Sequence, residues 1–341
     1  MQTIYKIILI ALSCILFSYC GNKHNNTTDS GLQDSLITKI NSPELKTISK
    51  KISENVNDPN LYNERAKIYL TLGMPDEAAK DAERAIKLDS LNPNYYLTKA
   101  DAFFSANKTK QSKETLELIE KKFPDNTEAL LKLGELFFIV RQYQIAIDYC
   151  NKALKIDENL SKAYFIKGSI YRESGDTAKA ISSLITATEQ DNRYDQAFFD
   201  IGVLYAARKN PVSLDYYDNA LKINPLNYDA IYAKAKFYQD INQIEEAINQ
   251  YNYLLSKDKT YYAALYNLGA IQLEIKNDPK KSIDYFSDAI RLKADYLEAY
   301  FARGYAYSKV GDKESAKADY KMCLQLQENY EPAIVALNKL N

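Results

Sequence analysis

The sequence predicts an all-α protein built as a solenoid of paired helices, and three observations support this fold class. First, residues 59–330 repeat with a period of 34 residues, eight times in succession. Second, the eighth and twentieth places of each repeat hold only Ala, Gly or Ser, which let two helices approach closely. Third, each repeat contains two stretches of helical apolar spacing with a turn signal between them. A fixed period of this length indicates stacked helix pairs, because one pair cannot bury its apolar face alone.

Residues 1–20 have the layout of an export signal. Lys6 supplies a positive charge, and residues 7–18 form an apolar run that is too short to span a bilayer. The run ends at Cys20, and polar residues follow it. This segment resembles a bacterial lipoprotein signal peptide, and the resemblance implies cleavage before Cys20 and a lipid anchor on that residue. It departs from the pattern at Tyr19, where a small residue is usual. Cys14 is a second candidate, and an ordinary secretory leader is the alternative.

Three further segments lie outside the repeats. Residues 21–42 are mostly polar, and we expect a flexible tether with a short helix near its end. Ser42-Pro43-Glu44 is typical of a helix start, so residues 43–58 are predicted to form an N-terminal capping helix. Residues 331–341 are too short for another repeat and have Pro332 at a helix start, which predicts a C-terminal capping helix. Such caps hide the terminal apolar faces of a repeat array.

Each repeat is predicted to form two antiparallel helices. In the first repeat, helical spacing runs from Tyr62 to Leu72, Gly73 ends it, and a second run extends from Asp76 to Leu88. The predicted repeats are residues 59–92, 93–126, 127–160, 161–194, 195–227, 228–261, 262–296 and 297–330. The fifth is therefore one residue short and the seventh one residue long.

Recurrent residues within the period identify a family. An aromatic residue fills the eleventh place in seven of the eight repeats, and Leu133-Gly134 and Leu268-Gly269 recur in phase. This pattern resembles the tetratricopeptide repeat family, although Tyr or Phe stands where that family often has Trp. The resemblance implies a right-handed superhelix of about eight helix pairs. It also implies that the first helix of each pair lines a concave groove that binds other proteins.

Composition argues against several classes of function. Lys plus Arg number 44 and Asp plus Glu number 45, so there is no basic excess for nucleic acid. The single histidine, His24, lies outside the repeats, which disfavours zinc sites and most general-base chemistry. We therefore expect no catalytic residues, no metal and no cofactor. An enzyme that pairs Asp200 with Asp240 or Glu173 is the alternative. Cys150 and Cys323 are expected to be free, buried thiols.

The resemblance also implies that the fifth place of each repeat faces the groove. It holds Asn63, Leu97, Leu131, Phe165, Phe199, Tyr232, Tyr266 and Phe301. The five successive aromatic rings are candidates for binding an extended partner, because rigid rings bury much area at low entropic cost. Lys162, Lys236 and Asn267 lie at neighbouring inward places and are candidates for polar contacts. The alternative is that the fifth-place rings pack against the adjacent repeat.

These features predict a non-catalytic interaction scaffold or adaptor. The signal and the tether favour a lipid-anchored protein of the bacterial cell envelope, at the outer membrane and facing the periplasm, not in the cytoplasm. The expected partners are other envelope proteins or extended peptides. The alternative is a module that captures peptide or glycan for an envelope machine. Neither the partner's identity nor the oligomeric state follows from the sequence.

Overall fold

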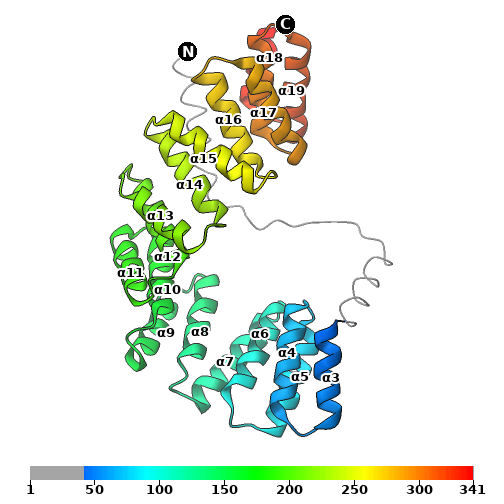
Figure 1. The fold of residues 1–341 in the computed structure, drawn as a ribbon, viewed down its shortest axis with the longest axis vertical. Helices are drawn as coiled ribbons and strands as arrows, with labels where there is room; N and C mark the ends of the chain where they lie inside the picture. Colours follow the sequence, from blue (N-terminus) through cyan, green and yellow to red (C-terminus); the bar gives the residue numbers. More distant parts are fainter. Residues whose placement is uncertain (1–41, 341) are drawn as a thin grey trace. The chain divides into compact units, whose positions relative to one another are not determined.

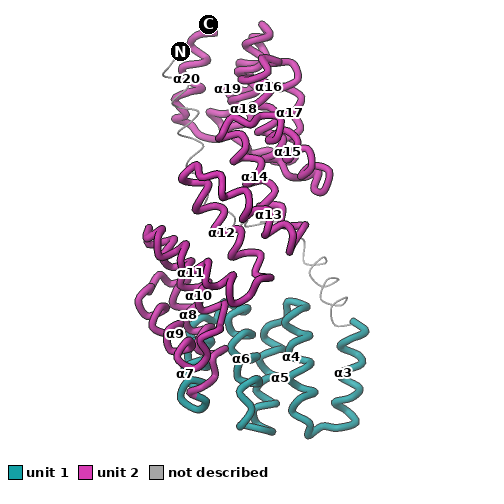
Figure 2. The backbone as a smooth tube through the Cα atoms, turned by 60° about the vertical axis from the view of Figure 1, so that its left-hand side comes forward, with its two compact units in different colours: residues 1–123 teal, residues 124–341 magenta. Residues whose placement is uncertain are grey.

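The computed structural model describes residues 42–340, and every regular element in that range is an α-helix (Figure 1). The expected all-α fold of stacked helix pairs is confirmed. The predicted signal peptide, the lipidation site at Cys20 and most of the tether lie outside the described residues. The described residues form two compact units, 42–123 and 124–340 (Figure 2).

The described part of the first unit is a single helix followed by two helix pairs. Its helices are α3 (Pro43–Glu54), α4 (Pro59–Thr71), α5 (Pro75–Leu88), α6 (Pro93–Ser105) and α7 (Thr109–Lys122). Asp58 and Asn92 begin the first helix of each pair by accepting a hydrogen bond from the backbone two residues later. Proline at the first helical position of α4 and α6 fits the same helix starts.

The described part of the second unit contains six helix pairs and a final single helix. The first four pairs are α8 (Thr127–Ile139) with α9 (Tyr143–Ile156), α10 (Ser161–Glu173) with α11 (Thr177–Gln190), α12 (Asp195–Ala206) with α13 (Ser213–Ile223), and α14 (Tyr228–Asp240) with α15 (Ile244–Lys257). The last helices are α16 (Tyr262–Glu274) with α17 (Pro279–Leu292), α18 (Leu297–Lys309) with α19 (Lys313–Leu326), and α20 (Glu331–Leu340).

Small residues allow the two helices of a pair to pack closely. A Cβ atom on Gly202 of α12 would lie 2.6 Å from the ring of Tyr217 on α13, so only glycine fits under that ring. Tyr217 is 1% exposed and fills the space between the two helices. The eighth-place glycine thus faces a large side chain of its own second helix, which explains the small-residue pattern of the sequence.

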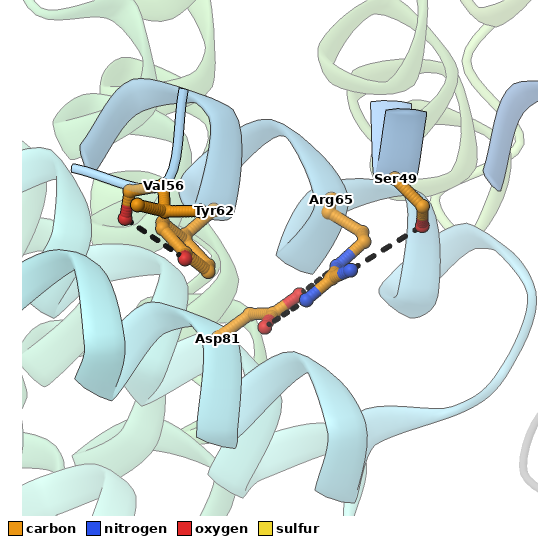
Figure 3. A network of polar contacts seen from close by, with 5 residues as sticks. All are labelled: Ser49, Val56, Tyr62, Arg65 and Asp81. Atoms are coloured by element: carbon orange, nitrogen blue, oxygen red, sulfur yellow. Dashed lines mark hydrogen bonds and ion pairs between the residues drawn. The ribbon is translucent and has the colours of Figure 1, made fainter. Parts of the chain in front are cut away.

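Helix α3 packs as the second helix of an incomplete pair. Its buried Leu45, Ile48 and Ile52 contact the apolar side of α4. The guanidinium of Arg65 donates to both carboxylate oxygens of Asp81, at 2.6 and 2.8 Å, and to Oγ of Ser49 on α3 at 3.3 Å (Figure 3).

The same three-residue contact recurs in the second unit. Arg303 on α18 donates to both carboxylate oxygens of Asp319, each at 2.8 Å, and to Oγ of Ser287 on the preceding α17 at 3.0 Å. Ser49 and Ser287 both lie 16 residues before their arginine. Helix α3 therefore occupies the position that α17 has in a complete pair.

The hydroxyl of Tyr62 donates to the carbonyl of Val56 at 3.0 Å and fixes the loop between α3 and α4 (Figure 3). Tyr96 makes the equivalent contact with the carbonyl of Ser90, at 3.2 Å, in the loop between α5 and α6. At the other end of the described chain, α20 packs against α19 through the fully buried Ala333. The N-terminal capping helix thus makes the same polar contact as a repeat helix, and the C-terminal one is held by apolar packing.

Candidate functional site

The first helices of successive pairs contact each other directly in the second unit. Lys162 on α10 forms an ion pair with Glu135 on α8 at 2.9 Å, and Arg172 on α10 forms one with Asp200 on α12 at 2.7 Å. We call the surface of α8, α10, α12, α14, α16 and α18 the A-helix face. It is the surface on which the sequence places the candidate binding residues.

The five fifth-place aromatic residues of the second unit lie half-buried on these helices. Four of the rings contact an aromatic ring of the second helix of their own pair, at centroid distances of 5.6 to 6.1 Å. These contacts are Phe199 with Tyr217, Tyr232 with Tyr251, Tyr266 with Phe286, and Phe301 with Tyr320. Each of these four rings is therefore packed within its own helix pair.

A second contact joins four of these rings to the last residue of their repeat, at centroid distances of 4.8 to 5.6 Å. The pairs are Phe165 with Tyr194, Tyr232 with Tyr261, Tyr266 with Tyr296, and Phe301 with Tyr330. We call Tyr194, Tyr261, Tyr296 and Tyr330 the boundary tyrosines. The boundary tyrosines were not expected from the sequence, although their recurrence at the last place of four repeats is a visible signal.

The boundary position also precedes the first helix of the next pair. Where this position holds asparagine, as at Asn126 and Asn227, its side chain caps that helix by accepting a backbone hydrogen bond. Where it holds Tyr194, Tyr261 or Tyr296, no side-chain cap is present. These repeats have aromatic packing in place of a capping hydrogen bond worth about 1 kcal/mol.

Phe199 differs from the other four rings. The boundary residue of its repeat is Asn227, which caps α14 and has no ring, so the structure gives Phe199 one aromatic contact, with Tyr217. Phe199 thus contacts one aromatic ring, whereas Tyr232, Tyr266 and Phe301 each contact two.

The three polar candidates have different surroundings. Lys162 is committed to its ion pair with Glu135, and Asn267, which is 4% exposed, donates from Nδ2 to the Tyr232 hydroxyl at 2.9 Å. Lys236 forms no ion pair or hydrogen bond with the residues from 42 to 340. Asn267 thus orients the ring of Tyr232, and Lys236 is the candidate whose charge is available.

Two carboxylates of the alternative enzymatic interpretation, Asp200 and Glu173, are engaged in contacts within the fold, whereas the third, Asp240, forms no ion pair with any residue from 42 to 340. Asp200 is 2% exposed, pairs with Arg172 and accepts from Gln196 at 3.2 Å. Burial raises the pKa of Asp200, and the nearby Arg172 offsets part of that effect. Glu173 accepts a hydrogen bond from the hydroxyl of Tyr143 at 2.9 Å. The contacts of Asp200 with Arg172 and of Glu173 with Tyr143 each join two neighbouring repeats.

The remaining chemistry of the described residues is limited. Cys150 and Cys323 are buried and not bonded to each other, and burial raises the pKa of both thiols to about 12. Within residues 42–340 no cluster of three or more His, Cys, Asp or Glu side chains is placed to hold a metal ion. None of the helices in that range combines the length and the apolar character needed to cross a membrane.

Comparison with known families agrees with this geometry. Models of the tetratricopeptide repeat match residues 59–90, 97–161, 161–194, 216–249 and 297–330, which together cover more than half of the chain. The chain belongs to the tetratricopeptide repeat family. Its helix pairs are therefore the repeat units of that family.

Individual relatives are distant. The chain is 23% identical over 222 residues to DnaJ homolog subfamily C member 3 of Gallus gallus, a match that covers 60% of this chain and 43% of the relative. This chain thus spans less than half the length of that relative.

Solved structures show the fold. A tetratricopeptide repeat protein from Parabacteroides merdae is 19% identical, with a TM-score of 0.52 over 73% of this chain and 98% of the other. The APC/C hetero-tetramer Cut9-Hcn1 contains a chain that is 16% identical, with a TM-score of 0.53 over 92% of this chain and 63% of the other.

Proposed function

We propose that this protein is a non-catalytic scaffold that binds partner proteins or extended peptides on its A-helix face. The observation that carries this proposal is the series of aromatic rings at the fifth place of five successive repeats. Among the four rings that contact a ring of their second helix, Phe199 has the fewest aromatic contacts. Rigid rings of this kind are typical anchors in protein interfaces.

The second part of the proposal concerns location. The apolar run and Cys20 in residues 1–20 support a lipid anchor in the bacterial cell envelope, at the outer membrane and facing the periplasm. The polar segment after Cys20 supports a tether between that anchor and the repeats. Replacement of Cys20 by serine should abolish incorporation of a labelled fatty acid and release the protein from the membrane fraction.

Partner capture tests the scaffold. The protein is purified in detergent from gently crosslinked membranes, and co-purified proteins are quantified for the wild type and for a Phe199→Ala, Tyr232→Ala double variant. We expect a stoichiometric partner with the wild type and its loss with the variant at unchanged helicity. A Tyr253→Ala variant on the second helix α15 is the matched control, because its ring is 44% exposed and lies off the A-helix face. Failure to recover any partner would contradict the scaffold.

Glycan capture is less well supported than protein binding. Stacking of a sugar on an aromatic ring requires an open ring face, whereas boundary tyrosines pack against Phe165, Tyr232, Tyr266 and Phe301. A shift in melting temperature with oligosaccharides but not with peptides would favour the glycan module.

A further inference from the structure

The last described helix, α20, has the position of a first helix of a pair. Its Ala333 is fully buried against α19, as Ala299 of α18 is buried against α17 in the preceding repeat. Val335 then has the place that Phe301 has on α18, where Phe301 packs against Tyr320 of the second helix at a centroid distance of 5.6 Å. Within residues 42–340 no second helix follows α20, so the corresponding side of α20 is uncovered.

This uncovered side of α20 is apolar at its centre and charged at its ends. Ile334 is 39% exposed and Val335 is 45% exposed, although both side chains are aliphatic. Glu331, Asn338 and Lys339 are also exposed and lie on the same side, because residues three, four, seven and eight places apart share one side of a helix. We call these five residues the α20 face.

The two charges of the α20 face are placed symmetrically about its centre. Glu331 is four residues before Val335 and Lys339 is four residues after it, so each lies about 6 Å along the helix from Val335. They are the only charged residues of Glu331–Leu340, and neither side chain forms an ion pair or a hydrogen bond with residues 42–340. A two-fold axis at Val335 would therefore place Glu331 of each copy opposite Lys339 of the other.

A second copy of this chain fits the α20 face, because the face is complementary to itself. An antiparallel pair of α20 helices covers Ile334 and Val335 of both copies and brings opposite charges together at both edges. It also places the N-terminal end of each helix dipole beside the C-terminal end of the other. Such a contact closes after two copies, whereas a helix from an unrelated protein would have to supply the same two charges in reverse order.

We propose that the protein forms a two-fold symmetric dimer in which the α20 face of one copy packs antiparallel on the α20 face of the other. The inference goes beyond the proposed function and uses none of the fifth-place rings. Helix α20 has 10 residues and is about 15 Å long, so the contact buries less than the roughly 1,200 Å² of a stable interface. The dimer is therefore weak, with an expected dissociation constant of about 10–100 μM.

Charge reversal tests the antiparallel arrangement. The dissociation constant of the full chain is measured by sedimentation equilibrium in density-matched detergent, and circular dichroism verifies the helicity of each variant. Glu331→Lys and Lys339→Glu should each weaken the dimer about tenfold, because each replaces two attractions across the axis by two repulsions. The variant that carries both reversals should regain most of the wild-type affinity. Glu246→Lys, an exposed reversal on the second helix α15, is the matched control and should leave the affinity unchanged.

Crosslinking tests the position of the axis without changing a charge. Val335→Cys places two thiols opposite each other and should give a disulfide-linked dimer on mild oxidation, above the background of the wild type. Val212→Cys, a valine of similar exposure (42%) at the start of α13, should not. A wild type that stays monomeric at micromolar concentrations, single reversals without effect, a double reversal no better than the single ones, or equal crosslinking of both cysteine variants would overturn the inference. The capture experiment judges the scaffold separately.

Discussion

The ring of Tyr296 packs against the ring of Tyr266 with centroids 5.2 Å apart, and this contact joins the last residue of the repeat to its first helix, α16. Tyr296 also meets Tyr262 edge-on, at 5.2 Å and 80°. Its position is the one at which other repeats carry a capping asparagine. The boundary residue therefore has two alternative uses in this chain, which are to cap the following helix or to extend the aromatic packing.

Substitution of Tyr296 separates these two uses. Because the ring is 8% exposed and contacts two others, Tyr296→Ala should lower the free energy of unfolding by about 3 kcal/mol. Tyr296→Asn should recover about 1 kcal/mol of that loss, since asparagine can cap α18. Urea unfolding followed by circular dichroism measures both. Equal stability of the alanine and asparagine variants would show that the boundary position cannot accept a cap in this repeat.

Close approach within a pair predicts different effects for two glycines. An added methyl group at Gly202 would lie 2.6 Å from the rigid Tyr217 ring, so Gly202→Ala should cost about 1–3 kcal/mol of stability. At Gly134 the nearest atom is Sγ of Cys150 at 3.3 Å, and Gly134→Ala should be neutral or gain up to about 1 kcal/mol from helix propensity. Thermal unfolding of the two variants provides the comparison. A larger loss at Gly134 than at Gly202 would contradict this explanation.

Two buried serines at the twentieth place also predict opposite outcomes. Ser112 Oγ donates to the carbonyl of Ala100 at 2.8 Å, whereas Oγ of the fully buried Ser213 has no hydrogen-bond partner among residues 42–340. Ser112→Ala should therefore destabilise the protein by about 1 kcal/mol, and Ser213→Ala should be neutral or stabilising by a similar amount. The midpoint of urea unfolding distinguishes them. A clear loss of stability in Ser213→Ala would mean that its hydroxyl has a partner in solution.

The buried Asp200 predicts a pH dependence of stability. Its pKa is raised above the ordinary value of 3.8, mainly by burial, so the folded state binds the proton more tightly than the unfolded state. Its contribution to stability is then greatest at low pH and is lost as the pH rises through the raised pKa. The difference in unfolding free energy, wild type minus Asp200→Asn, should fall as the pH increases above 3.8.

Urea unfolding at a series of pH values measures this difference. A Gln196→Ala variant, which keeps the carboxyl and removes one of its hydrogen-bond donors, should retain a downward trend relative to Asp200→Asn. A difference that stays constant or increases with pH would show that Arg172 outweighs burial at this site.

Much of the architecture could be predicted because the repeat period and the small-residue places are local properties of the sequence. Helix starts such as Ser42-Pro43 and the break at Gly73, where φ is 69°, depend on a few adjacent residues and are found where expected. The candidate binding surface was harder to predict from the sequence. The sequence indicated which helices carry Phe199 and Tyr266, but it could not indicate what else contacts their rings.

The amino-acid sequence by itself determined that this chain folds as repeated helix pairs, because periodic apolar residues and matched small residues leave each pair no other way to bury its core. Only the tertiary structure decided which polar and aromatic groups are used between repeats. Lys162 and Asp200 form ion pairs with residues on neighbouring helices, whereas Asp240 and Glu274 form none with any residue between 42 and 340. Such pairing depends on distances across repeats, and sequence spacing alone does not fix those distances.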